Sequence, residues 1–499
     1  MATPTQNSVP FQEIPLPGNQ LTAAELSGYK WGSGGIRTGA DLTYSFPSGS
    51  VTYISNYGSD GDASEWKAGG TALNSIQQAR FADALDEYAG LGRLTFTQVA
   101  DNSSTVGEIR ATFTAEIDGA QTGGFGYYPG PDPAAGDVWF PSFIPSGFSN
   151  FSDVSDGSWG FQTFLHEIGH ALGLKHPFED FPLLPSQFDN MFYTVMSYTQ
   201  DPFGNDYDMD RFPSTPMLLD VQAIQYMYGA NFAHNAGNTT YTYYEGGKYL
   251  ETIWDGNGFD TIQYVGNSGG TIDLRPGHFS KLGDPVSFTD SFGNFKYSTS
   301  STVAVAYSTQ IENAIGSAGS DILWGNAANN WLYGNAGNDF VVGLNGIDRL
   351  FGGPGNDKLL GGNGTDILVG GPGNDRMEGG PGADALNGGT GSDKFIFNSV
   401  LSNAEADRVY FFASGEDKLK IDDDVFTNLA TFAGNPLSAN EFAANATGQA
   451  LDADDRILYN TSTGELFYDV DGNGAGAAQL FATLVDAPAL VATDILVIA

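Results

Sequence analysis

A nine-residue repeat between Gly316 and Phe395 constrains the fold of this chain more than any other feature of its sequence. An acidic or amide residue recurs at one phase of the repeat, and an apolar residue follows two positions later each time. These apolar positions are Leu323, Leu332, Val341, Leu350, Leu359, Leu368, Met377, Leu386 and Phe395. A flexible Gly-rich linker has no reason to keep apolar residues at one phase of nine successive repeats. The repeat therefore predicts short strands separated by Gly-rich turns.

The repeat also predicts how its acidic side chains are arranged. Six turn residues and three strand residues make half a coil, so residues 18 apart lie on the same edge of a parallel β-roll. Copies such as Gly-Gly-Pro-Gly-Asn-Asp at 352–357 match the pattern of rolls that bind Ca2+ between their coils. One predicted ladder holds Asp321, Asp339, Asp357, Asp375 and Asp393, and the other holds Asp348, Asp366 and Asp384, with Asn330 in a degenerate place.

Calcium is expected to be part of this fold. Glycines allow left-handed turns whose carbonyl oxygens point into the slot between coils, where they complete an oxygen cage with the carboxylates. The turn glycines expected at these sites are Gly353, Gly355, Gly362, Gly364, Gly371 and Gly373. Without the cation, stacked carboxylates repel one another and the thin core cannot compensate. We therefore expect disorder at low calcium and folding when calcium is supplied.

Three of the five histidines lie within eleven residues, at His166, His170 and His176, and Glu167 stands beside the first of them. Imidazoles four residues apart project from one face of a helix, and Gly173 lets the chain turn so that the third imidazole returns. This spacing predicts a Zn2+ site with three nitrogen ligands and an open position for water. Glu167 is then placed to act as the general base of peptide hydrolysis. The alternative is a structural zinc, or a helix with satisfied core histidines.

The composition excludes several classes of function. With 59 Asp and Glu against 20 Lys and Arg, the formal charge of -39 repels phosphate backbones and anionic lipids, so nucleic acid is not an expected partner. There is no cysteine, which removes disulfides, thiolate nucleophiles and Cys-ligated metals. Neither a basic leader with an apolar stretch nor a run of eighteen apolar residues occurs, so we expect no signal peptide and no membrane insertion. Taken alone, this would indicate a cytoplasmic protein.

A chain of 499 residues is expected to form more than one domain. We divide it into a flexible leader or pro-segment at 1–20, an α+β domain at 21–235, a parallel β-roll region at 236–399 and a C-terminal β region at 400–499. Apolar periodicity and end signals predict the elements of the α+β domain. They are half-buried strands over 42–46 and 109–113, and helices between Thr71 and Gly90, over 161–172, and from a cap at 214–216 to Tyr228.

Further motifs accompany the histidines. Residues 193–198, Tyr-Thr-Val-Met-Ser-Tyr, look like a turn that contains methionine, and the segments 27–32 and 219–225 stand before and after it. Together with the histidine motif and the calcium repeats, these segments resemble the metzincin metalloproteases, and most closely their serralysin branch, over nearly the whole chain. The resemblance implies an α+β metzincin-like catalytic domain followed by an all-β parallel β-roll domain.

The resemblance also implies roles for single residues. The three histidines would be zinc ligands, Glu167 the catalytic base and Met196 the floor beneath the metal. Tyr198 would be an additional zinc ligand or would stabilise the tetrahedral intermediate, although a tyrosine packed under the turn is the alternative. The segment 124–129 looks like the edge strand on which such enzymes align an extended peptide. Residues 177–182, Pro-Phe-Glu-Asp-Phe-Pro, depart from the family's Gly-Asp-Tyr-Asn continuation after the proline, so the rim of the cleft is expected to differ.

The resemblance finally implies a secreted, extracellular, monomeric enzyme that acts on protein or peptide substrates. Such proteins resemble substrates of one-step, type I export machinery, and residues 494–498 look like its uncleaved C-terminal signal. A chain without disulfides, whose roll folds only in abundant calcium, suits passage in an unfolded state. The alternative class is a non-catalytic exported surface or adhesion protein. Glu167 argues against that class, because a mere binding site has no need of the base.

Overall fold

The computed structural model describes residues 10–47, 71–102, 105–114, 123–132, 134–142 and 151–499. The chain forms two compact units. Unit 1 comprises residues 1–236, 248–258 and 284–309, and unit 2 comprises residues 237–247, 259–283 and 310–499. The chain thus enters unit 2 after residue 236 and returns to unit 1 twice.

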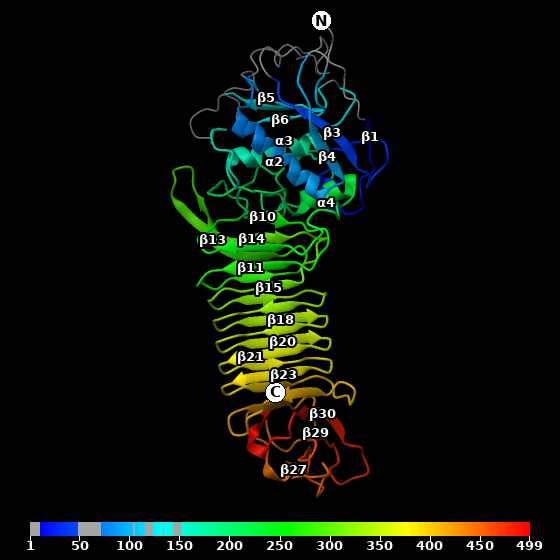
Figure 1. The fold of residues 1–499 in the computed structure, drawn as a ribbon, viewed down its shortest axis with the longest axis vertical. Helices are drawn as coiled ribbons and strands as arrows, with labels where there is room; N and C mark the ends of the chain where they lie inside the picture. Colours follow the sequence, from blue (N-terminus) through cyan, green and yellow to red (C-terminus); the bar gives the residue numbers. More distant parts are fainter. Residues whose placement is uncertain (1–9, 48–70, 103–104, 115–122, 133, 143–150) are drawn as a thin grey trace. The chain divides into compact units, whose positions relative to one another are not determined.

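Within its described residues, unit 1 combines a five-stranded sheet with four α-helices (Figure 1). The strand order is β4-β3-β5-β7-β6, and only β6 runs antiparallel to its neighbour. The strands are β3 Ala40–Ser45, β4 Leu94–Gln98, β5 Ile109–Thr114, β6 Phe125–Gly126 and β7 Val138–Pro141. The helices are α1 Gln20–Ala24, α2 Ser75–Leu91, α3 Trp159–Leu172 and α4 Leu218–Tyr228.

Strand β5 is buried along its whole length. The alternation of apolar residues in its sequence predicts a strand with only one buried face. The strand lies between β3 and β7, so both of its edges are paired. Its polar residues are buried with partners, because Arg110 forms an ion pair with Asp101 at 2.8 Å and the Thr112 hydroxyl donates to the Thr71 carbonyl at 3.2 Å. Partnered polar side chains make the burial of both faces possible.

Two helix starts differ from their predictions. Helix α2 begins at Ser75 because Asn74 accepts from the Ile76 and Gln77 amides while the Gln77 side chain accepts from the Asn74 amide. Ile76, which the predicted stripe buried, is 69% exposed, and the helix continues past Gly90 to Leu91. Helix α4 begins at Leu218 without a serine cap, since the Asp220 carboxylate accepts from the Met217 amide at 2.7 Å.

Part of the segment predicted as a flexible leader or pro-segment has regular secondary structure. Strand β1 Phe11–Glu13 pairs antiparallel with β2 Tyr29–Trp31, and α1 begins at Gln20. Residues 1–9 of that segment lie outside the described residues.

Three further strands are neighbours in the order β10 Glu251–Ile253, β14 Phe295–Val305 and β13 Phe279–Thr289. The short strand β8 Asp208–Met209 also pairs with β13.

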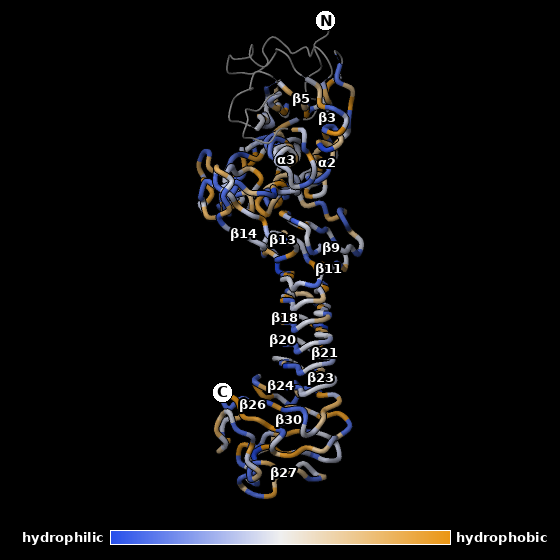
Figure 2. The backbone as a smooth tube through the Cα atoms, turned by 90° about the vertical axis from the view of Figure 1, so that its left-hand side faces the viewer, coloured by the Kyte–Doolittle hydropathy of each residue, from blue (hydrophilic) through white to orange (hydrophobic). Residues whose placement is uncertain are grey.

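Unit 2 is a parallel β-roll. Figure 2 shows β18 and β20 on one side of the roll and β21 and β23 on the other. One sheet follows β12-β16-β18-β20-β22-β24-β26-β31, and the other has the order β27-β28-β29-β30-β25-β23-β21-β19-β17-β15-β11-β9. Residues 18 apart are partners, as in the pairing of Leu323 with Val341 and of Leu332 with Leu350. The nine predicted apolar positions are all fully buried, so the predicted fold class is confirmed.

The strands of unit 2 have the following bounds. The first sheet is built from β12 Thr271–Asp273, β16 Ile322–Trp324, β18 Phe340–Asn345, β20 Lys358–Asn363, β22 Arg376–Glu378, β24 Lys394–Phe397, β26 Lys418–Asp422 and β31 Ile495–Ile498. The second is built from β9 Thr240–Tyr244, β11 Thr261–Val265, β15 Asn313–Ile315, β17 Trp331–Tyr333, β19 Arg349–Phe351, β21 Ile367–Pro372, β23 Ala385–Thr390, β25 Asp407–Tyr410, β27 Phe442–Asn445, β28 Ile457–Asn460, β29 Glu465–Tyr468 and β30 Gln479–Leu484. Short 3-10 turns at Ala439–Glu441 and Ala492–Asp494 precede β27 and β31.

Candidate metal centre

Helix α3 carries the first two histidines of the motif. Ser158 caps its start by accepting from the Phe161 amide at 3.2 Å, and Gly173 ends it in the left-handed region at φ 109°. A Cβ atom at Gly173 would collide with the Tyr29 carbonyl, so glycine is required both for the turn and for the close approach. The chain then reverses, which brings His176 back toward the helix.

The three imidazoles converge through their Nε2 atoms. His176 Nε2 lies 3.1 Å from His166 Nε2 and 3.0 Å from His170 Nε2, and the ligand atoms of the three residues all lie within 4.8 Å of one another. Nitrogen ligands at about 2.0–2.1 Å from a tetrahedral zinc are roughly 3.3 Å apart, so this spacing fits the ion. Within the described residues, these histidines form the one such cluster of His, Cys, Asp and Glu side chains.

Hydrogen bonds set the tautomer of the two helical ligands. His166 Nδ1 donates to the Val195 carbonyl and His170 Nδ1 donates to the Leu174 carbonyl, each at 2.8 Å. The proton on Nδ1 leaves Nε2 with a lone pair for a metal. Burial, together with the neighbouring His176, lowers the pKa of His166 to about 3, so the neutral form that a metal needs is favoured.

Glu167 is buried among these ligands with part of its carboxylate unused. Its Oε2 atom has no hydrogen-bond partner, and burial raises the pKa of its carboxyl well above the usual value. A Cβ atom on Gly124 would lie 2.6 Å from Glu167 Oε1, so the segment leading into β6 packs directly against the glutamate. A buried oxygen without a protein partner has the property expected of a group that acts on a substrate or a water.

The methionine turn lies under helix α3. A Cβ atom on Gly169 would approach Met196 Sδ to 2.6 Å, so Gly169 gives the sulfur its place against the helix between the two histidines. Met196 is fully buried. Met196 thus lies against the helix that carries the first two histidines, as expected of a residue beneath the metal, and it contacts the helix through van der Waals packing.

A buried carboxyl pair holds this turn. Asp220 in α4 accepts from the Val195 amide at 2.8 Å and from the Thr194 hydroxyl at 2.7 Å, and Glu25 Oε2 lies 2.9 Å from the same hydroxyl. One hydroxyl proton can serve only one carboxyl, so the other contact needs a proton on the carboxyl itself. Burial, then the charge of Asp220, raises the pKa of Glu25 well above its usual value, which makes Glu25 the protonated member.

Tyr198 and the chain after His176 form the open side of the site. The Tyr198 ring is 59% exposed and lies 4.6 Å from the His176 ring and 5.5 Å from the His166 ring, between centroids. Phe178 stacks on His176 at an interplanar angle of 7° and a centroid distance of 5.0 Å. Tyr198 is therefore beside the ligands and accessible, and the alternative of a tyrosine buried under the turn is not what the structure shows.

The departure at 177–182 has a structural role at the third ligand. Glu179 Oε1 lies 2.8 Å from His176 Nδ1, a contact that is short but not aligned as a hydrogen bond. Lys175 Nζ donates to the Asp180 carbonyl at 3.1 Å and holds the following loop. A carboxylate beside the outer nitrogen of a metal-binding histidine favours the ligand tautomer, and the sequence motif did not reveal this residue.

The predicted peptide-aligning segment includes strand β6. Its residues Phe125 and Gly126 pair antiparallel with β7 and stand at the end of the five-stranded order, with packing against α3.

The aspartates of unit 2 form the two predicted ladders. Each step joins a backbone amide to the Oδ1 atom of the aspartate 18 residues later, as from Asp321 to Asp339 and from Asp348 to Asp366, both at 2.8 Å. The second carboxylate oxygen is buried and has no partner at Asp339, Asp348, Asp357, Asp366, Asp375, Asp384 and Asp393. Buried oxygens without donors, repeated along an edge, fit the oxygen preference of Ca2+.

The first turn of the roll differs from the others. Asp321 Oδ2 accepts from the Ser317 amide at 2.6 Å, and Asn330 Nδ2 donates to the Glu312 carbonyl at 2.9 Å. Protein groups therefore satisfy these two positions. The predicted turn glycines Gly353, Gly355, Gly362, Gly364, Gly371 and Gly373 all have positive φ, and at Gly353 a Cβ atom would collide with the Asn335 carbonyl of the neighbouring coil.

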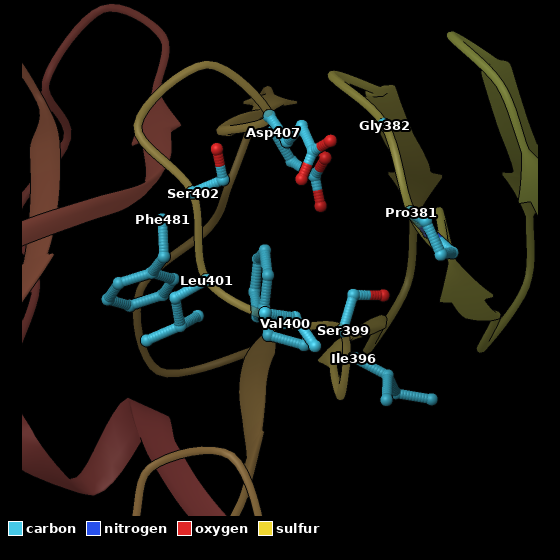
Figure 3. Close-up of a pocket in the computed structure, with 12 residues that line it drawn as sticks. Pro381, Gly382, Ile396, Ser399, Val400, Leu401, Ser402, Asp407 and Phe481 are labelled. Atoms are coloured by element: carbon cyan, nitrogen blue, oxygen red, sulfur yellow. The ribbon is translucent and has the colours of Figure 1, made fainter.

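Two further aspartates extend the ladders beyond the regular repeat. Asp407 Oδ1 accepts from the Asp384 amide at 3.0 Å, and Asp417 Oδ1 accepts from the Asp393 amide at 2.9 Å. Insertions make these separations 23 and 24 residues, which hides them from a search at fixed period. The Asp-x-apolar pattern persists at both, before Val409 and Leu419, and could have revealed them. Figure 3 shows Asp407 at a pocket that also contains Ser402, Pro381 and Phe481.

Comparison with known proteins agrees with both parts of this description. Residues 315–350, 333–368, 342–377 and 360–395 match the family model of the RTX calcium-binding nonapeptide repeat. The chain is 32% identical to serralysin A of Dickeya chrysanthemi, over 64% of this chain and 65% of that protein. It is 32% identical to serralysin B of Dickeya chrysanthemi, over 57% and 58% of the two chains, and 29% identical to serralysin of Proteus mirabilis, over 58% and 60%.

These matches confirm the resemblance to serralysins and the calcium-binding repeat. The chain spans about three fifths of the length of the relatives it matches. The activity of those proteins therefore comes to this chain as a proposal.

Removal of the Asp220 carboxylate is expected to weaken the metal centre from outside it. In Asp220→Ala the buried amides of Val195 and Met217 lose their acceptor, so the melting temperature should fall and zinc affinity should drop by about 10–100-fold. Zinc retention in competition with a chelator measures the second effect. Asp206→Ala, at an exposed position in unit 1, is the control. Equal zinc retention in the two variants would contradict the positioning role.

The ladders predict that protons and calcium replace one another. Burial, more than neighbouring charge, raises the pKa of Asp366 to about 6 and of Asp348 and Asp375 to about 7. Since these folded-state values exceed the unfolded value, the stabilisation is complete below about pH 4 and is lost as pH rises through 6–7. With a chelator present, hydrogen exchange in peptides from 339–393 of the full chain should be slow at pH 4 and fast at pH 7.5, after correction for intrinsic rates. Calcium should restore protection at pH 7.5; protection that persists there without calcium would contradict the account.

Proposed function

We propose that this chain is a secreted zinc endopeptidase that cleaves polypeptides, with calcium bound along the roll of unit 2. The observation that carries the proposal is the convergence of three histidine Nε2 atoms beside a buried glutamate whose Oε2 atom has no protein partner. A structural zinc site closed by four protein ligands needs no such group. The similarity to serralysins supports the same reaction class.

Each residue of the site has a task in amide hydrolysis. His166, His170 and His176 would hold the zinc ion, which when bound supplies a Lewis acid that polarises a carbonyl and lowers the pKa of water. Glu167 would take the proton from the attacking water and return it to the departing amine. Its burial keeps bulk water from competing for the carboxylate and raises its pKa toward the range that suits a general base.

Tyr198 would stabilise the charge that develops on the substrate oxygen. Partial loss of hydration beside the histidines, then the charge of Glu167, raises the pKa of its hydroxyl above the usual value, so the group remains a hydrogen-bond donor at neutral pH. Its ring stands beside two of the ligands and is exposed to an incoming substrate. A donor aimed at a developing oxyanion acts mainly on kcat.

Polypeptides are the substrate class that the surrounding surface suits. The exposed side chains of Phe125 and Phe178 offer apolar contacts near the metal centre to the side chains of a polypeptide. Phe178 stands where the family pattern has glycine, so the preferred side chain next to the cleaved bond is expected to be apolar and to differ from that of the relatives.

Secretion through a type I machine is part of the proposal. RTX calcium-binding repeats, the absence of cysteine and a roll whose carboxylates need a cation suit a chain that crosses unfolded and folds outside. Residues 495–498 of the proposed signal at 494–498 form β31, which pairs with β26, so the signal would be read before the roll folds. None of the helices in the described ranges combines the length and apolar character that a bilayer span requires.

Glu167→Gln separates catalysis from metal binding. The variant keeps the shape of the side chain and removes the base, so kcat for a peptide substrate should fall by about 10²–10⁴-fold while zinc content stays unchanged. Timed assays of peptide cleavage measure kcat, and metal analysis of the same samples measures zinc content. Glu13→Gln, at an exposed position of unit 1, controls for the loss of one carboxylate. Equal cleavage by Glu167→Gln and the parent would defeat the mechanism.

Tyr198→Phe tests the second catalytic group. The ring and its contacts with the histidines remain while the donor is lost, so kcat should fall by about 10–100-fold with KM nearly unchanged. Steady-state kinetics on a short peptide measure the split. Tyr244→Phe, at an exposed tyrosine of unit 2, is the matched control. A change confined to KM would assign Tyr198 to substrate binding instead.

A further inference from the structure

An exposed aromatic surface lies on the hairpin of β13 and β14 in unit 1. Phe292 in the turn is 88% exposed, and Phe295 at the start of β14 is 65% exposed. Phe203, in the loop before β8, is 75% exposed. Figure 1 shows the hairpin in green near the β13 label. Large exposed apolar side chains that gather at one place mark a surface used for binding.

The turn that presents Phe292 is held by a single carboxylate. Asp290 Oδ1 accepts from the Phe292 amide at 3.0 Å and from the Asn294 amide at 2.9 Å, and Asp290 Oδ2 pairs with Lys296 Nζ at 2.7 Å. The exposed phenylalanine therefore stands on an ordered turn. A turn that is already ordered before binding loses less conformational entropy when a partner binds.

Two aromatic residues of β14 share one face of the strand. Phe295 and Tyr297 point to the same face, because residues two apart in a strand share a face. The Tyr297 ring stacks on Phe288 of β13 at 4.6 Å and meets Phe203 edge-on at 5.4 Å, between centroids. The aromatic side chains of this region thus include Phe203 in contact with Tyr297, and the exposed rings of Phe295 and Phe292 nearer the hairpin turn.

The same hairpin is tied to the loop that leaves the candidate site. The buried Asp201, three residues after Tyr198, accepts from the Tyr297 hydroxyl and from the Phe203 amide. That loop continues into β8, which pairs with β13 at Phe288. The hairpin is therefore positioned by the segment that carries Tyr198.

One edge of β14 is open. Strand β10 pairs with β14 only at residues 303–305, so among the described residues the stretch 295–302 has no strand partner opposite β13. The edge of β13 is, by contrast, covered in part by β8. Residues 291–301 contain one lysine and no acidic residue, in a chain with 59 Asp and Glu. A strand edge with a single charged residue, flanked by aromatic rings, suits an extended polypeptide, which pairs through its backbone and places alternate side chains in apolar contact.

We infer that this hairpin is an exosite that binds an unfolded stretch of the polypeptide substrate outside the residues next to the cleaved bond. The inference rests on the proposed endopeptidase activity, since it names a second contact for that substrate. A protein substrate reaches both places, whereas a peptide of a few residues reaches only the metal centre. The hairpin should therefore lower KM for proteins and leave peptide cleavage unaffected.

The test compares two substrates on one double variant. Phe292→Ser with Phe295→Ser removes the exposed rings, and Phe432→Ser, at an 83% exposed phenylalanine of unit 2, is the control. The double variant should raise KM for casein by about five- to tenfold, with kcat and the kinetics of a six-residue peptide unchanged. Equal KM for casein in the double variant and the control would overturn the exosite.

A binding measurement keeps the exosite separate from the activity. In the Glu167→Gln background, fluorescence anisotropy of labelled casein should show the same five- to tenfold loss of affinity for the double variant. If the parent cleaves neither substrate, the proposed function fails while this measurement still decides the exosite. Sedimentation provides the remaining outcome: a parent dimer that the double variant dissociates would assign the surface to a second copy of the chain and overturn the inference.

Discussion

The backbone of Val195 is the point on which the candidate metal centre depends. Its carbonyl accepts from His166 Nδ1 at 2.8 Å and from Gln162 Nε2 at 3.1 Å, while its amide donates to Asp220 at 2.8 Å. A neutral imidazole donates from one nitrogen only, so the bond to this carbonyl decides which nitrogen faces the metal. The orientation of a ligand in α3 is in this way set by a carboxylate in α4.

The two units prepare their metal-binding atoms by the same physical means. In unit 1 a backbone carbonyl occupies Nδ1 of a histidine and leaves Nε2 free. In unit 2 a backbone amide occupies Oδ1 of an aspartate and leaves Oδ2 free. In each case a backbone group binds one end of a two-ended side chain, which fixes its direction, and the other end faces the proposed ion site. Preorganisation of this kind reduces the cost of binding an ion.

Local periodicity accounts for the parts of the structure that the sequence could predict. The nine apolar positions are buried as expected, and helix α3 ends at Gly173 where the motif requires it. Glu25 and Asp220 meet at Thr194 only through tertiary packing, so no spacing in the sequence announces them. Asp407 is hidden for a different reason, because an insertion breaks the period while the hydrogen-bond ladder continues.

The two sets of buried carboxyls place different demands on their surroundings. Glu25 and Asp220 share the Thr194 hydroxyl, and a proton on Glu25 removes the second charge, so this pair carries one charge even though Glu25 Oε1 has no hydrogen-bond partner. The ladders of unit 2 repeat an unpartnered oxygen at seven aspartates, each with its first oxygen already in use. Burial of charge without partners costs several kcal/mol per group, more than a core of one apolar residue per repeat can offset. We therefore expect that unit to need cations between its coils at neutral pH, so that its folding would follow the calcium concentration of its surroundings.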